Sequence, residues 1–137
     1  MMTRAQLSKF LWTRLGLTFL LSGFFTAIIA LALFSASSGS LEGNQALTLA
    51  VLAGIGWSLI LTVCSITVFF NLDAAIAHNR IYNFITWYFL PITAAASYAI
   101  FNITSDMWLD SLAMTVPFFA IQTFFYIQFN KRVAIAG

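Results

Sequence analysis

Four long apolar segments without a charged side chain constrain this sequence more than any other feature. They are Leu15–Phe34, Ala46–Phe70, Phe84–Phe101 and Leu112–Phe129. Each reaches the length of about 17–25 residues that a helix needs to cross the hydrocarbon layer of a bilayer. The segments lack the alternation of barrel strands, and a helix satisfies its backbone hydrogen bonds within itself. The sequence therefore predicts an all-α membrane protein, a bundle of four transmembrane helices.

The four spans and their connections form one predicted domain over residues 1–137. We expect the spans at about 12–35, 46–71, 83–102 and 108–129, the length range of spanning helices. The connections between them are too short for a second domain. Since 61% of the residues are hydrophobic and only 7% charged, against about 25% charged in a soluble domain, the expected surroundings are the lipid bilayer. A net charge of +2 without a dense basic patch predicts no binding of nucleic acid.

The charged residues predict the orientation of the spans. All six basic residues lie on one side of the predicted bundle: Arg4, Lys9, Arg14, Arg80, Lys131 and Arg132. The other side holds three of the four acids and no base: Glu42, Asp106 and Asp110. Under the positive-inside rule both termini are then cytoplasmic. The small size and very short connections favour a bacterial inner membrane.

Small side chains recur every four residues along the second apolar segment. This small-residue stripe comprises Ala46, Ala50, Gly54, Ser58 and Thr62. Small side chains allow membrane helices to approach closely. The stripe predicts either packing against another helix of the same chain or a seam to a second copy or a partner. Trp57, near the middle of this span, is expected to face lipid, with a place beside a cavity as the alternative.

Gln122 lies near the middle of the fourth predicted span. An unsatisfied amide inside the membrane costs several kcal/mol, so we expect a hydrogen bond to another helix, with a ligand contact as the alternative. Pro91 and Pro117 each remove one backbone donor and are expected to bend their helices.

Polar side chains gather at the cytoplasmic ends of the predicted spans. The inner polar cluster comprises Arg14, Asn71, Asp73, His78, Arg80, Asn83 and Gln128, with Asn79 and Asn130 beside them. Asp73 is the one acid on this side, and Arg14 and Arg80 are its candidate partners. The cluster predicts either interfacial side chains that cap helices and extend toward water, or a site for a head group, an anion or a protein.

The sequence contains no combination of residues typical of an active site. It has no nucleophile beside a base, no carboxylate pair and no metal cluster, and His78 and Cys64 are the only residues of their types. We therefore expect a protein without enzymatic activity, cofactor or metal. It would act by helix packing and binding of a membrane protein, as an accessory subunit or an immunity-type protein. The alternative is a channel, carrier or flippase for a small or lipid-linked substrate, as a homo-oligomer.

Overall fold

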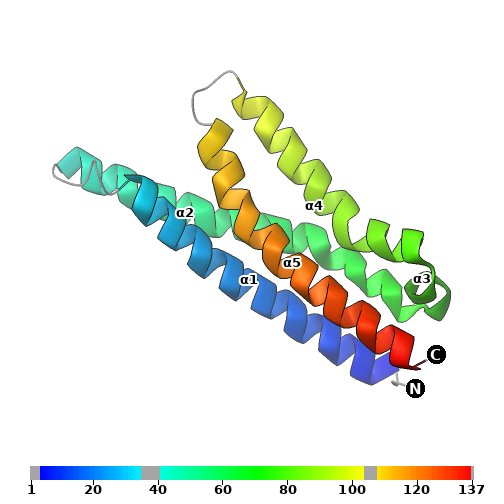
Figure 1. The fold of residues 1–137 in the computed structure, drawn as a ribbon. Helices are drawn as coiled ribbons and strands as arrows, with labels where there is room; N and C mark the ends of the chain where they lie inside the picture. Colours follow the sequence, from blue (N-terminus) through cyan, green and yellow to red (C-terminus); the bar gives the residue numbers. More distant parts are fainter. Residues whose placement is uncertain (1–3, 35–40, 104–107, 137) are drawn as a thin grey trace.

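Four long helices dominate the computed structural model, which describes residues 4–34, 41–103 and 108–136. They are α1 (Arg4–Phe34), α2 (Leu41–Cys64), α4 (Arg80–Asn102) and α5 (Trp108–Ala136) (Figure 1). Four helical segments are long and apolar enough to cross a membrane. The prediction of an all-helical bundle with four helices of spanning length is thus confirmed.

The helix bounds differ from the predicted spans mainly at the basic ends. α1 begins at Arg4 rather than near residue 12, and α5 continues to Ala136 rather than ending near residue 129. Amphipathic basic side chains continue a helix readily once it is nucleated, so a charge does not mark its end. Residue 35 of the first predicted span and Asp106 lie outside the described residues.

The second span ends in a way that its hydropathy did not predict. α2 stops at Cys64, a 3₁₀ helix η2 (Ser65–Leu72) follows, and a short helix α3 (Ala74–His78) turns the chain toward α4. A 3₁₀ helix has three residues per turn, so side chains three apart lie in one line. The buried residues of η2 have this spacing: Ser65, Val68 and Asn71. The tighter winding therefore directs one row of side chains into the bundle.

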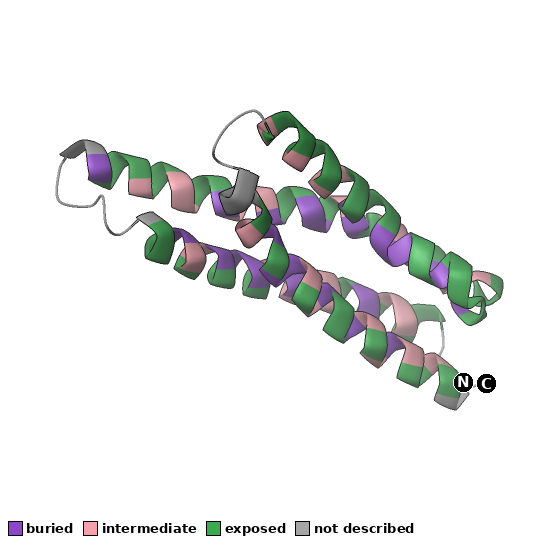
Figure 2. Ribbon diagram, turned by 45° about the horizontal axis from the view of Figure 1, so that its top comes forward, coloured by how far each residue is buried: buried purple, intermediate pink, exposed green. Residues whose placement is uncertain are grey.

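The helices form two hairpins, α1 with α2 and α4 with α5, which contact each other mainly through α1 and α5 and through α4 and η2. α1 packs along α2 and also along α5, whereas α4 packs mainly on η2. α3 and both chain ends lie at the same end of the bundle, which we call the inner end (Figure 1). Toward the other end, α4 diverges from α1 and α2 (Figures 1 and 2). Tertiary packing is consequently densest in the inner half.

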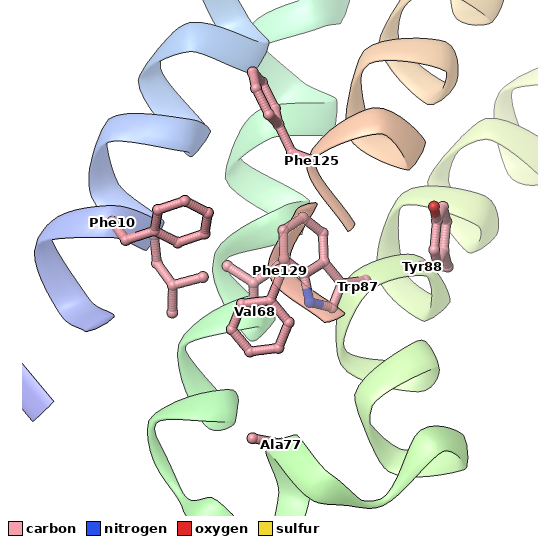
Figure 3. Close-up of a cluster of buried hydrophobic side chains, with 8 residues drawn as sticks. Phe10, Val68, Ala77, Trp87, Tyr88, Phe125 and Phe129 are labelled. Carbon is pink, nitrogen blue, oxygen red and sulfur yellow. The ribbon is translucent and has the colours of Figure 1, made fainter. Parts of the chain in front are cut away.

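An aromatic core joins the helices in this inner half. Phe10 of α1, Val68 of η2, Trp87 of α4 and Phe129 of α5 converge there (Figure 3). The ring centroid of Phe129 lies 5.7 Å from that of Trp87 and 6.5 Å from that of Phe10. Elsewhere many large apolar side chains are exposed on outward faces (Figure 2), as helices surrounded by lipid require.

The small-residue stripe of α2 lies partly against α1. Gly54, Ser58 and Thr62 are buried, Ala50 is half-buried and Ala46 is exposed. Ser58 Oγ lies 3.4 Å from Thr26 Oγ1 on α1. A Cβ atom added at Gly54 would lie only 2.7 Å from Thr26 Cγ2. Close approach at Gly54 thus serves a contact within the chain.

Candidate functional site

Polar side chains line the interior of the bundle. Those that are buried include Thr18, Ser22, Thr26, Ser58, Thr62, Ser65, Asn71, Asn83, Thr86, Thr115 and Gln122. Buried polar groups need hydrogen-bond partners because desolvation without a partner is costly. Several hydroxyl groups bond a carbonyl of their own helix, as Thr18 Oγ1 does to the Arg14 carbonyl at 2.8 Å. The longer amide side chains instead connect different helices.

Gln122 supplies a hydrogen bond that the backbone of α4 lacks because of Pro91. Proline has no N–H, so the carbonyl four residues earlier, that of Trp87, has no α-helical donor. Gln122 Nε2 on α5 donates a hydrogen bond to this carbonyl. Ser65 Oγ of η2 lies 3.4 Å from Gln122 Oε1 and 3.0 Å from the Leu61 carbonyl, and it shares its one hydrogen between these two acceptors. One buried amide therefore links α5 to both α4 and η2.

Two asparagines of the inner polar cluster make a second set of links. Asn71 Nδ2 donates to Thr86 Oγ1 on α4 at 2.7 Å and to the Val68 carbonyl at 3.0 Å. Asn83 Nδ2 donates to Asn130 Oδ1 on α5 at 2.7 Å. Sequence reasoning missed Thr86, although it lies three residues after Asn83 and so shares its helix face.

Several buried polar atoms at this end have no hydrogen-bond partner among the described residues. They are Arg14 Nε, Asn71 Oδ1, Asn83 Oδ1 and Trp87 Nε1. Both amide side chains already use their Nδ2 groups on acceptors. The Oδ1 atoms of Asn71 and Asn83 are acceptors without a donor. A hydroxyl group or a water molecule can provide such a donor.

The remaining cluster members do not form the predicted ion pairs. The Arg14 guanidinium lies over the rings of Phe10 and Phe125, 5.0 and 4.9 Å from their centroids, a cation–π arrangement. The Asp73 carboxylate accepts a hydrogen bond from Ala75 N at 2.9 Å and caps α3. Among the described residues Asp73 makes no ion pair with Arg14 or Arg80.

The inner polar cluster thus divides into two groups. Asn71 and Asn83 are buried, and Arg14 and Gln128 are half-buried. The exposed members are Asp73, His78 and Arg80. The ring Nδ1 of His78 lies 2.8 Å from the Ala74 carbonyl within α3. The two groups differ in burial, although Asn71 from the first and His78 from the second line the same cavity.

A cavity of about 270 Å³ opens at the inner end, between the start of α1, α3 and the end of α5. We call it the inner cavity. Its wall is mostly apolar and includes Leu7, Leu72, Phe129 and Val133. Its polar lining residues are Arg4, Asn71, His78 and Arg132. The Arg132 guanidinium lies 4.7 Å from the centroid of the Phe10 ring, which also lines the cavity.

A second hollow, the outer groove, lies between the outer halves of α4 and α5. It has a volume of about 740 Å³ and is wide open and apolar. Small side chains are prominent in its lining: Ala95, Ala96, Ala99 and Ala120. The groove lies beside a contact of Trp57, whose Nε1 donates to Thr115 Oγ1 on α5 at 3.0 Å.

The expectation that Trp57 faces lipid is therefore wrong. Its ring also stacks on Tyr98 of α4, with 4.3 Å between the centroids. Trp57 joins α2 to both α4 and α5, because an indole offers a large apolar face and one donor that needs a partner when buried.

Comparison with protein-family models, curated proteins and solved structures finds no match to this chain. The chemistry of its sites follows from their geometry. The lining of the inner cavity includes arginines, an asparagine and apolar side chains, a combination chemically suited to an anionic or hydroxylated group. The outer groove is lined by small apolar side chains, which are suited to close helix packing.

Proposed function

We propose that this chain is a multi-pass protein of a bacterial inner membrane, with both termini in the cytoplasm. Four helices of spanning length support the membrane assignment. The six basic residues, all near the inner end, support the orientation through the positive-inside rule. Reporter fusions at the two termini test it: both must report the cytoplasm, and a periplasmic signal from either end would contradict it.

Within the membrane we propose that the chain acts by binding a partner membrane protein, as an accessory or immunity-type subunit, and not by catalysis. The observation that carries this proposal is the outer groove. Its alanines allow a helix backbone to approach, and close van der Waals packing drives helix association in lipid. The contacts of Trp57 with Thr115 and Tyr98 support a groove that is preformed before a partner binds.

Larger side chains in the outer groove are expected to weaken partner binding. A photo-crosslinking side chain at Ala96 should yield one discrete protein adduct in native membranes. The double variant Ala95→Leu with Ala99→Leu should reduce this adduct about tenfold, because the added side chains occupy the space of the partner helix. The readout is the adduct yield on a denaturing gel.

The matched control places the same crosslinker at Ala53, an exposed alanine of α2 that does not line the groove. It should yield no discrete adduct. Equal adducts at Ala53 and Ala96, or adducts with lipid alone at Ala96, would contradict partner binding. An adduct of twice the chain mass would identify the partner as a second copy of the chain.

A second candidate function is transport of a small or lipid-linked substrate by an oligomer. The inner cavity favours it, since a carrier needs a binding site that opens to one side of the membrane. Purified protein in vesicles distinguishes the two functions. Transport without any added partner would favour a carrier or channel over an accessory subunit.

A further inference from the structure

The inner cavity has the charge pattern of a binding site for a negatively charged amphiphile. Arg4, from the first turn of α1, and Arg132, near the end of α5, bring two permanent positive charges to it. No acidic side chain is among its described lining residues. The rest of the wall is largely apolar, with Phe129 fully buried. A ligand that matches this lining has an anionic group attached to an apolar chain.

Asn71 adds a requirement for a hydrogen-bond donor. Asn71 is completely buried and is one of the residues that line the cavity. Both hydrogens of Nδ2 are directed to acceptors, Thr86 Oγ1 and the Val68 carbonyl. Oδ1 has no partner among the described residues, and an unpaired buried acceptor is unfavourable. A hydroxyl group on the ligand would supply the missing donor.

The size of the cavity limits how much of a ligand enters. A volume of about 270 Å³ falls just below the roughly 300–1,000 Å³ of pockets that enclose a whole small molecule. A complete phospholipid is therefore too large, whereas a head group and the first carbons of its chains are not. If the four helices span a bilayer, Arg132 lies three residues beyond the fourth predicted span, at the level of the head groups, and Arg4 lies farther toward the cytoplasm, about 12 Å from the start of the first predicted span.

We propose that the inner cavity binds the head of an anionic lipid that carries both a phosphate and a hydroxyl group. Arg4 and Arg132 hold the phosphate, Asn71 Oδ1 accepts from the hydroxyl group, and Phe129 and Val133 contact the first chain carbons. This inference requires the membrane location but is independent of partner binding in the outer groove. Its failure would leave that proposal intact.

The test uses the full chain in a neutral detergent and a fluorescent phosphatidylglycerol as probe, with binding measured by anisotropy. The double variant Arg4→Gln with Arg132→Gln should bind the probe at least tenfold more weakly, because losing even one hydrogen bond to a charged group costs roughly a decade of affinity. The matched control is Lys9→Gln with Lys131→Gln. It removes the same charge from the same end at positions that do not line the cavity, and should bind within about twofold of wild type.

A third variant tests the apolar wall with both arginines intact. Val133→Trp, at a half-buried position of the lining, should also weaken binding about tenfold by occupying the cavity. Thermal unfolding shows that each variant remains folded. Equal losses in the arginine and lysine variants would overturn the proposal in favour of nonspecific attraction. So would competition by inorganic phosphate as strong as that by unlabelled phosphatidylglycerol, which would indicate a free-anion site.

Discussion

Gln122→Leu is expected to lower the free energy of unfolding by about 1–2 kcal/mol. Leucine is similar in size to glutamine, but it lacks the amide N–H that donates to the Trp87 carbonyl. Pro91 prevents the backbone from supplying another donor. The carbonyl is then left buried without a partner. Reversible unfolding in mixed micelles, followed by circular dichroism, measures the loss.

The cost of Gln122→Leu should also be measured in a protein that carries Pro91→Ala. Alanine restores the N–H that an α-helix directs at the Trp87 carbonyl, so Gln122→Leu should cost much less in the Pro91→Ala protein. The difference defines a coupling of about 1 kcal/mol between residues on different helices. Equal costs in both backgrounds would show that Gln122 does not replace the missing backbone donor.

Gln128→Leu is the matched control for Gln122→Leu. It changes the same residue type on the same helix, at a half-buried position without a side-chain hydrogen bond among the described residues. We expect a change below about 0.5 kcal/mol. A loss as large as that of Gln122→Leu would indicate a general effect of the substitution on α5.

Gly54→Ala should destabilise the bundle by about 1–3 kcal/mol, although alanine favours an isolated helix. The new Cβ atom would lie 2.7 Å from Thr26 Cγ2, so either α1 and α2 move apart or Thr26 rotates away from its hydrogen bond to the Met114 carbonyl. Gly56→Ala is the control, because nothing lies within 4 Å of a Cβ atom there. It should leave stability unchanged or raise it. The midpoint of unfolding in mixed micelles compares the two variants.

Thr26→Ser is expected to rescue Gly54→Ala. Serine removes the Cγ2 atom but keeps the hydroxyl group that donates to the Met114 carbonyl at 3.2 Å. The combined variant should therefore regain most of the lost stability. If Gly54→Ala and Gly56→Ala behave alike, or if serine gives no rescue, the contact between Gly54 and Thr26 does not set the spacing of α1 and α2.

Hydropathy alone predicted the long helices, because membrane spanning depends on local length and composition. It did not predict η2, because hydropathy does not distinguish a 3₁₀ helix from an α-helix. In η2 the buried residues Ser65, Val68 and Asn71 are spaced three apart. The inner polar cluster was predicted as a set, but its division was not. Arg14 lies over Phe125 of α5, a contact between distant parts of the chain, whereas Asp73 caps α3 through Ala75 N two residues away.

The sequence by itself determined that there are four apolar helices and that the basic residues lie at one end of them. Both properties follow from the order of residues along the chain, because each helix satisfies its own backbone whatever lies beside it. Only the tertiary structure decided that Gln122 meets the carbonyl freed by Pro91, that Gly54 meets Thr26, and that α4 diverges to leave a groove. These contacts depend on the fit of side chains between helices, for which lipid provides no general driving force.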